Sequence, residues 1–324
     1  MTQSGPALVT QYLSASTYPA KLIADPGTIA MIKRGFIPPI HVQLSPTNRC
    51  TRACSFCNCR GRDKDAELSL AQIMQCLRDF FSLGARALTI TGGGEPLCYP
   101  DLDAVIEFAA NLGYDVGLIT NGDLLSVKPS DAALHRLTWC RISASDETNQ
   151  IAALEERVAA HFSVDWALSY VVTAKFDSSN LMEHIAWAER ANMTHIRILE
   201  DHTNLGKTLG IEQVEALVGV DNPRIIYQHR KEFFRGPANC RIGLLKPYVG
   251  SEGNIYPCCG IQFALGDKRY ALPKELSLCA IEDIKEFWHK PTLFNGSQCV
   301  QCYYQMYNDV LRILTSNIAH GGFL

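Results

Sequence analysis

Three cysteines lie close together in this sequence, at Cys50, Cys54 and Cys57. Thiolates at such short spacing are typical ligands of zinc and of iron–sulfur clusters. A structural zinc site requires four ligands in closed geometry, whereas this loop supplies three. Three cysteines suit a four-iron cluster in which one iron stays open for a substrate or cofactor. On these residues alone, a zinc knuckle and three incidental thiols remain alternatives.

A run of three glycines, Gly92 to Gly94, continues into Glu95 and Pro96 directly after an expected strand. Consecutive glycines let the backbone approach a ligand closely, with amide groups free to donate hydrogen bonds. Glu95 could accept a hydrogen bond from an ammonium group. Taken alone, the run is also compatible with a tight turn between a strand and a helix.

The cysteine loop, which carries Phe56 just before its third cysteine, and the Gly-Gly-Glu-Pro stretch together resemble the radical S-adenosylmethionine (SAM) superfamily. The resemblance implies a 4Fe–4S cluster on Cys50, Cys54 and Cys57, with SAM on the open iron. It also implies reductive cleavage of SAM to methionine and a 5′-deoxyadenosyl radical that abstracts hydrogen from a substrate. The residues it implies at SAM are Phe56 and Leu199 near adenine, Gly93, Gly94 and Glu95 at the ammonium, and Asn121, Ser143 and Ser145 at ribose or carboxylate.

A second group of cysteines follows in the last third of the chain, and its members are Cys240, Cys258, Cys299 and Cys302. Their spacing resembles the twitch domain, a shortened form of the SPASM domain, and this resemblance implies one auxiliary 4Fe–4S cluster. Four cysteines also suit a structural zinc site, so that alternative stays open. Cys259 could replace Cys258 as the ligand, although adjacent side chains point in different directions.

The remaining cysteines include two candidates for a catalytic role. Cys98 lies just past the glycines, and Cys279 lies in the C-terminal part. Either could donate a hydrogen atom to a substrate radical, although both could equally be small buried hydrophobic residues. Cys76 and Cys140 are expected in the core.

The elements that must position these residues alternate between strands and helices. Strands are expected at 41–44, 87–91, 115–120, 140–144, 166–173 and 195–199, and Ser69 with Gln72 predicts a capping box for the first helix. Six strand–helix units predict an α/β fold, a partial (β/α)6 barrel. We expect an N-terminal extension packed on the main domain at 1–40, the barrel at 41–225, and an auxiliary-cluster domain with a β-hairpin plus a helix at 226–324.

Composition limits the classes of partner. Net charge is −3, and 47% of residues are hydrophobic, as in ordinary globular domains. No apolar run is long enough to cross a bilayer, and residues 1–20 do not read as a signal peptide. Thirteen cysteines without a secretion signal favour reduced thiols and a cytoplasmic protein.

The function expected is that of a radical SAM oxidoreductase or isomerase that oxidises, epimerises or isomerises a small polar metabolite, such as an aminosugar, aminocyclitol or nucleoside. An electron donor such as flavodoxin or ferredoxin is the expected partner. Alternatives are modification of a macromolecule, either a ribosomal peptide or a nucleic-acid base, and a zinc-stabilised binding module. Candidate substrate contacts are the polar residues after late strands: Lys175, Asp177, Glu200, Asp201, His202 and Asn204.

Overall fold

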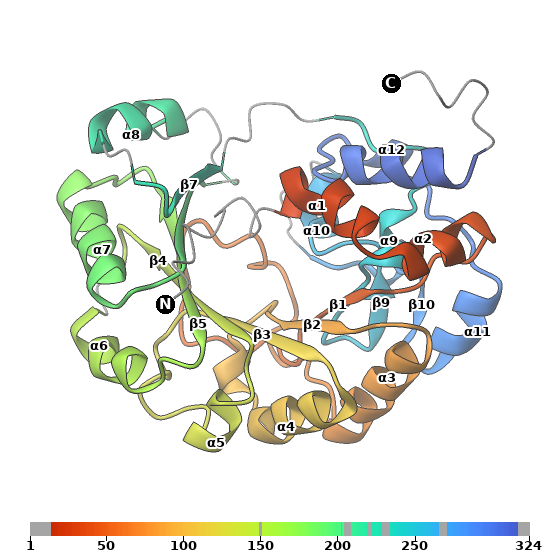
Figure 1. Ribbon diagram of the computed structural model, residues 1–324, viewed down its shortest axis with the longest axis horizontal. Coiled ribbons are helices and arrows are strands. Elements are labelled where there is room, and N and C mark those ends of the chain that lie inside the picture. Colours follow the sequence, from red (N-terminus) through yellow and green to blue (C-terminus); the bar gives the residue numbers. More distant parts are fainter. Residues whose placement is uncertain are drawn as a thin grey trace, which may run out of the picture.

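The computed structural model describes residues 14–148, 151–201, 203, 209–219, 222–228, 234–265 and 271–316. Its strands form one sheet in the order β10-β9-β8-β1-β2-β3-β4-β5-β6-β7. Seven of them are parallel neighbours: β1 (His41–Leu44), β2 (Ala87–Ile90), β3 (Asp115–Thr120), β4 (Trp139–Ser145), β5 (Asp165–Val172), β6 (His195–Glu200) and β7 (Ile225–Gln228). The sheet curves into a partial barrel (Figure 1), which confirms the predicted fold class. The seventh strand, β7, was not predicted.

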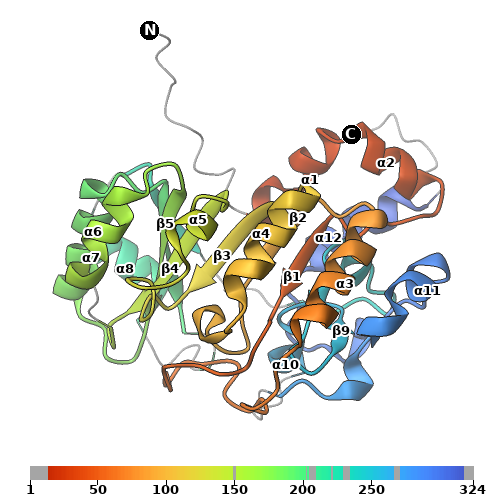
Figure 2. The same cartoon turned by 90° about the horizontal axis from the view of Figure 1, so that it is seen from below.

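Helices cover the outer face of the curved sheet. They are α3 (Leu70–Ser82), α4 (Leu102–Leu112), α5 (Asp131–Leu134), α6 (Ile151–Ala160), α7 (Ser178–Arg190) and α8 (Ile211–Val218). Figure 2 shows α3 and α4 along the outer side of β1, β2 and β3. The capping box is confirmed: Gln72 N donates to Ser69 Oγ at 3.2 Å, and Ser69 N donates to Gln72 Oε1 at 3.0 Å.

Alternation along the strands separates an apolar face from a polar one. In β4, Cys140 and Ile142 are completely buried in the core that the helices cover, and Cys76 of α3 joins them. The residues between them in sequence project to the opposite face, which is the inside of the barrel. That inner face carries polar side chains such as Gln43, Thr89 and Ser169.

The C-terminal part extends the same sheet. The hairpin strands β8 (Tyr248–Val249) and β9 (Asn254–Tyr256) are antiparallel, and β8 pairs in parallel with β1. Beyond them lie β10 (Cys279–Ala280), the helices α9 (Ile242–Leu245), α10 (Ile261–Ala264), α11 (Ile284–His289) and α12 (Gln305–Leu314), and the 3-10 turns η2 (Pro96–Cys98), η3 (Lys274–Leu276), η4 (Ile281–Asp283) and η5 (Gly296–Gln298).

The N-terminal helices α1 (Ser14–Ile23) and α2 (Pro26–Lys33) lie beside α12 (Figure 1). Tyr18 is 8% exposed, and its ring stacks on Tyr307 with the centroids 4.3 Å apart. The described part of the extension therefore packs against the C-terminal part as well, which was not expected.

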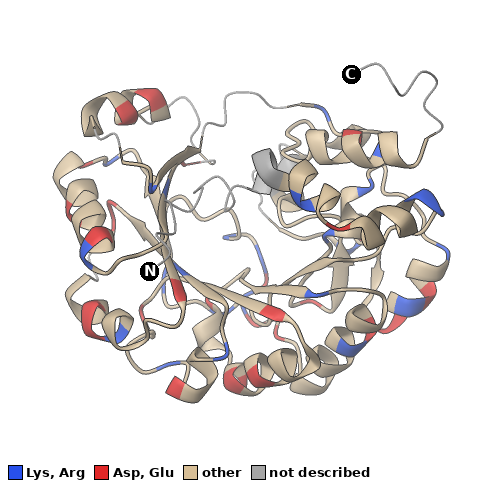
Figure 3. Cartoon of the chain, in the orientation of Figure 1, with Lys and Arg blue, Asp and Glu red and all other residues tan. Residues whose placement is uncertain are grey.

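Acidic and basic residues are distributed over the helices on both sides of the molecule (Figure 3). Among the described residues, no helix has the length and hydropathy needed to span a membrane.

Candidate active site

The glycine turn is held against the chain that leads into the cysteine loop. Gly93 N donates to Ser45 Oγ at 2.7 Å, Gly94 N to Thr47 O at 3.1 Å, and Glu95 N to Arg49 O at 2.8 Å. A Cβ on Gly94 would lie 2.0 Å from Arg49 O, so only glycine permits this approach. The turn therefore lies directly beside the residues that precede Cys50.

These contacts correct the expectation that the amides of the turn are free. The N–H groups of Gly93, Gly94 and Glu95 all donate within the protein. An ammonium group is itself a donor and needs acceptors. The carbonyl oxygens of the turn, not its amides, are thus the groups suited to an amino group of SAM.

Glu95 is 2% exposed, and both of its carboxylate oxygens accept hydrogen bonds from the protein. Oε1 accepts from Thr120 Oγ1 at 2.6 Å and from Leu97 N at 3.0 Å, and Oε2 accepts from Asn121 N at 2.6 Å. Burial raises the pKa of Glu95, and these hydrogen bonds oppose that shift. Glu95 therefore joins the glycine turn to the end of β3, and its predicted contact with the ammonium stays a prediction.

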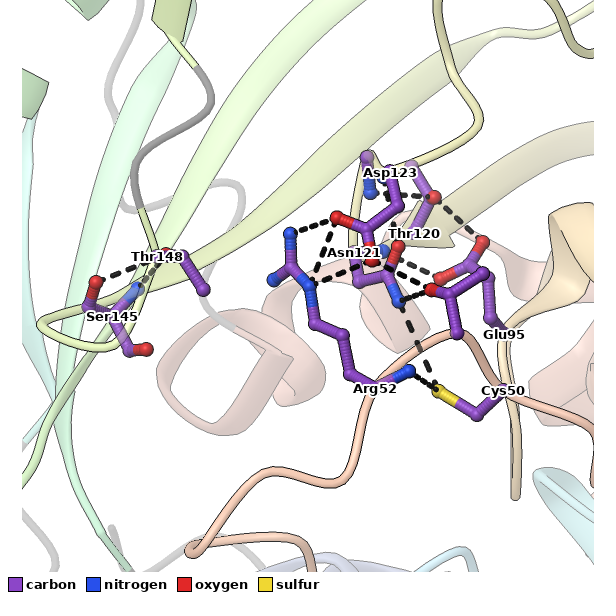
Figure 4. Close-up of polar contacts among 10 residues, drawn as sticks. Cys50, Arg52, Glu95, Thr120, Asn121, Asp123, Ser145 and Thr148 are labelled. Atoms are coloured by element: carbon purple, nitrogen blue, oxygen red, sulfur yellow. Dashed lines mark hydrogen bonds and ion pairs between the residues drawn. The ribbon is translucent and has the colours of Figure 1, made fainter.

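The end of β3 also holds the cysteine loop. Asn121 Nδ2 donates to Thr51 Oγ1 at 3.0 Å and lies 3.8 Å from Cys50 Sγ. Thr51 Oγ1 donates to Asp123 Oδ2 at 2.6 Å, and Arg52 forms an ion pair with Asp123 (Figure 4). A motif from the first strand and one from the third are thereby brought to one end of the barrel.

The three loop cysteines are exposed or half-buried. Backbone amides point at two of their sulfurs: Arg52 N lies 3.4 Å from Cys50 Sγ, and Cys59 N lies 3.4 Å from Cys57 Sγ. Such donors stabilise thiolates. The hydrogen bond from the Cys59 thiol and other nearby groups lower the pKa of Cys57 to about 6, whereas burial raises that of Cys54 to about 11. These donors and this exposure suit a cluster presented to a second ligand.

The other residues predicted at SAM come from the same end of the strands. Ser143 and Ser145 lie on the inner face of β4, and Ser145 is fully buried, with its N–H donating to Thr148 Oγ1 at 2.8 Å (Figure 4). Leu199 is 6% exposed in β6, and Phe56 is half-buried in the loop. Their roles toward SAM stay predictions.

The two candidate hydrogen donors lie in different surroundings. Cys98 ends η2, directly after the glycine turn, and burial raises its pKa, as do the charges of Glu95 and Cys50. Burial raises the pKa of Cys279 in β10 to about 12, and its charged neighbours are Asp283 and Glu282. Cys279 is partly buried and packs against the hydrophobic core that contains Cys76 of α3, the core that the outer helices cover.

The second set of cysteines lines one cavity. Cys240, Cys258, Cys299 and Cys302 all contribute to it, with Pro257 and Phe294 among the other lining residues. Cys259 does not line this cavity, and its Sγ lies 3.4 Å from the hydroxyl of Tyr304. Of the two adjacent cysteines, Cys258 is therefore the one that faces the other three.

The environment of this cavity fits a cluster held by four thiolates. Cys240 N donates to Phe294 O at 2.9 Å and Cys302 N to Phe234 O at 2.8 Å, and these bonds hold segments 234–240 and 294–302 together beside the cavity. Burial raises the pKa of Cys240 to about 11 and that of Cys299 to about 12, so ligation must displace protons. Among the described residues, no three His, Cys, Asp or Glu side chains converge on one point as ligands of a single metal ion.

The hairpin of the C-terminal part contacts the base of the cysteine loop, which the sequence did not indicate. Ser251 Oγ donates to Ser45 O at 3.0 Å, and Asn48 Nδ2 donates to Glu252 Oε1 at 2.9 Å. Arg62, 6% exposed, donates to the hydroxyl of Tyr248 at 2.6 Å. The C-terminal part thus helps to hold the first cysteine site.

The polar residues predicted as substrate contacts have mainly local structural roles. Asp177 caps α7, Glu200 accepts from Ile211 N at 2.7 Å, and Asp201 accepts from Thr203 N at 2.7 Å. Lys175 N donates to Thr173 Oγ1 at 3.1 Å. His202 and Asn204 lie outside the described residues.

Inward-facing residues that sequence reasoning missed include Arg141 of β4 and Arg197 of β6. Each alternates with buried apolar neighbours, as in Cys140-Arg141-Ile142 and Ile196-Arg197-Ile198. That alternation is the signal that could have found them, since it places both arginines on the face opposite the helices.

Comparison with known proteins agrees with this geometry. Residues 44–138 match the family model described as the radical SAM superfamily. The matched segment contains both the cysteine loop and the glycine turn. The match therefore gives this segment of the chain the sequence pattern of the radical SAM superfamily, and SAM and a 4Fe–4S cluster are the cofactors that this family implies.

Several curated proteins have sequences similar to this chain. A probable GTP 3′,8-cyclase of Methanopyrus kandleri is 37% identical over 125 residues, covering 38% of this chain and 39% of the relative. A probable GTP 3′,8-cyclase of Metallosphaera sedula is 27% identical over 294 residues, covering 76% and 92% respectively. The match to the Methanopyrus kandleri relative and to two further probable GTP 3′,8-cyclases covers less than two fifths of their own length, namely 39%, 38% and 34%.

Solved structures share the fold. SuiB of Streptococcus suis bound to S-adenosylmethionine aligns with a TM-score of 0.61 and 17% identity, covering 90% of this chain and 76% of SuiB. The anSMEcpe enzyme with bound AdoMet and a peptide aligns with a TM-score of 0.52 and 14% identity, covering 79% of this chain and 81% of that one. At these identities the likeness concerns the fold alone.

Proposed function

We propose that this chain is a radical SAM enzyme that removes hydrogen from a small polar metabolite inside the barrel. When bound, the cluster and SAM would supply two reactions: reductive cleavage of the sulfonium, and hydrogen abstraction from the substrate. Cys50, Cys54 and Cys57 would hold that cluster, and Cys240, Cys258, Cys299 and Cys302 would hold an auxiliary one. The observation that carries the proposal is the glycine turn held against the segment before Cys50, where Gly93 N donates to Ser45 Oγ at 2.7 Å and Glu95 N donates to Arg49 O at 2.8 Å.

The strand directions support a substrate between the two cysteine sites. The Cys50 loop follows the carboxyl end of β1. Because β9 runs antiparallel to β8, and β8 is parallel to β1, the chain leaves β9 toward the amino end of β1 and then continues through Cys258 into α10, where Gln262 Nε2 lies 3.9 Å from Cys59 Sγ. The inner face of the barrel next to these two groups carries polar side chains such as Gln43, Thr89 and Ser169. A polar lining inside a barrel suits a molecule of metabolite size, and the name GTP 3′,8-cyclase of the relatives points to a substrate of that size.

The test is turnover by anaerobically reconstituted, reduced protein with SAM and a panel of nucleotides, aminosugars, aminocyclitols and peptides. We expect 5′-deoxyadenosine in excess over the no-substrate control with a small molecule of the panel, and deuterium transfer from the labelled substrate. Stimulation by peptides alone would overturn the metabolite assignment. Absence of 5′-deoxyadenosine under every condition would overturn the enzyme class.

A hydrogen-donating thiol distinguishes epimerisation from oxidation. If Cys98 returns hydrogen, Cys98→Ala abolishes solvent hydrogen incorporation into product while SAM cleavage continues. Cys279→Ala, toward the outer helices, is the matched cysteine control and should leave the product unchanged. Equal products from wild type and both variants would remove a hydrogen-donating role for these cysteines.

A further inference from the structure

Arg141 brings a positive charge to the inner face of the barrel. Within the described part of the chain, the ion pairs formed do not include Arg141. Its Nε has no hydrogen-bond partner among the described residues, and its guanidinium lies over the Trp139 ring at 5.6 Å. A cation removed from water is costly unless an anion accompanies it.

Arg197 brings a second guanidinium to the same place. The register aligns Arg141 with Ala167 and His195, and Ser143 with Ser169 and Arg197, so both arginines lie on one face with β5 between them. Arg197 Nη2 donates to Ser169 Oγ at 3.0 Å. Burial and the charges of Arg141 and Arg197 together lower the pKa of His195 to about 3. The register places His195 on the same inner face as both arginines, one strand from Arg141 across β5 and two residues before Arg197.

The inner positions between the two arginines carry small side chains, whereas the large rings of Trp139 and His195 lie at or below the level of Arg141 toward the amino ends of β4 and β6. Ala167 and Ser169 of β5 and Ser143 of β4 occupy the inner positions between or beside them. Small residues leave room for a ligand group where large ones would fill it. Guanidinium groups present planar sets of donors that match phosphate or carboxylate oxygens.

We propose that Arg141 and Arg197 bind an anionic group, a phosphate or a carboxylate, of the substrate. This inference rests on the proposed function, because it places the substrate inside the barrel, and it narrows that function to anionic metabolites. The competing explanation is that Arg141 balances the charge of the auxiliary cluster, since Cys259, next to the proposed ligand Cys258, lies near enough to affect the pKa of Arg141.

The test measures binding rather than turnover. The reconstituted protein with SAM is titrated calorimetrically with inorganic pyrophosphate, with malonate and with glycerol as the uncharged control. We expect saturable binding of one anion, weakened at least tenfold in Arg141→Gln and in Arg197→Gln. Arg190→Gln, which removes an exposed arginine of α7, should bind like wild type. Pyrophosphate binding would indicate a phosphorylated substrate, and malonate binding a carboxylate.

Three results would overturn the inference. They are the absence of saturable binding of either anion, equal binding by wild type and both inner-face variants, and an Arg141→Gln variant that changes only the redox titration of the auxiliary cluster. If Arg141→Gln does not fold, Arg197→Gln and Arg141→Lys carry the same test. Because anion binding needs no SAM cleavage, an inactive protein that still binds the anion would contradict the proposed function and not this site.

Discussion

Glu95 shows how one buried side chain joins two elements at the end of the barrel. Its carboxylate accepts hydrogen bonds from Thr120, Asn121 and Leu97, so it fixes the glycine turn relative to β3. The motif predicts an acceptor for an ammonium group. In the structure the buried carboxylate accepts hydrogen bonds that connect the glycine turn to β3, and we call this connection the brace. The carboxylate links two elements because Oε1 accepts from Leu97 of η2 and from Thr120 of β3, and Oε2 accepts from Asn121 directly after β3.

Replacing Glu95 by glutamine tests that brace. An amide keeps one acceptor oxygen but turns an NH2 group toward a donor, so a buried hydrogen bond is lost. We expect Glu95→Gln to lower the free energy of unfolding by about 1–3 kcal/mol, and SAM affinity to fall with it. Urea titration provides the stability, and Glu107→Gln, at an exposed position of α4, is the control. Equal stability of the two variants would show that Glu95 does not brace the turn.

Gly94 gives a second test at the scale of one residue. A Cβ there would meet Arg49 O at 2.0 Å and Asn48 C at 2.4 Å, and both are backbone atoms. Relief requires the cysteine loop to move, so we expect Gly94→Ala to lose about 1–3 kcal/mol of stability, as overpacked sites do, and to lose SAM binding. Gly27→Ala, where the nearest atom is 3.4 Å away, should be nearly neutral in a thermal unfolding scan. A Gly94→Ala variant that binds SAM normally would contradict the close approach.

At the scale of elements, the end of β3 holds the cysteine loop through Asp123. Burial raises the pKa of Asp123, but hydrogen bonds from Arg52 and Thr51 and the charge of Arg52 lower it overall. Both partners of the Arg52–Asp123 pair are partly exposed, with side chains at 17% and 30%. Such a pair contributes little to global stability, so its main effect is on the position of the loop.

Asp123→Asn separates the two effects. We expect the free energy of unfolding to change by less than about 1 kcal/mol, as for exposed pairs, while the loop cluster is lost more readily. The measurement is iron per chain after timed exposure to a chelator, alongside chemical denaturation. Asp131→Asn, which removes the exposed carboxylate that pairs with Arg157, is the control. Iron retention equal to that of the control would show that β3 does not hold the loop.

The sequence predicts those elements whose cause is local. Ser69 and Gln72 mark a helix start, and Cys50, Cys54, Cys57 and the three glycines mark a site through short spacing. The pairing of β8 with β1 involves only Tyr248 and Val249, and no local pattern reveals it. The same holds for Tyr18 stacking on Tyr307 and for the amides of the glycine turn, because their partners come from distant segments.

At the scale of the whole molecule, the C-terminal cysteines follow strands that extend the sheet of the barrel, and Gln262 of α10 reaches the first cysteine loop, where its Nε2 lies 3.9 Å from Cys59 Sγ. The adjacent pair Cys258 and Cys259 offers a matched test of the second site. We expect Cys258→Ala to lose about four irons per chain, since a 4Fe–4S cluster needs its cysteine ligands, and Cys259→Ala to keep them. Iron and sulfide analysis of the reconstituted variants gives the result. Loss in Cys259→Ala with retention in Cys258→Ala would reverse the assignment drawn from the cavity.

The central claim is that the first cysteine site and the glycine turn form one SAM-cleaving centre. Its most direct measurement is 5′-deoxyadenosine formed from SAM by dithionite-reduced protein, compared between wild type, Cys54→Ala and Cys76→Ala. We predict formation by wild type and by the buried core variant Cys76→Ala, and none by Cys54→Ala. Equal formation by Cys54→Ala, or a wild-type protein that takes up zinc in place of iron and leaves SAM intact, would contradict it.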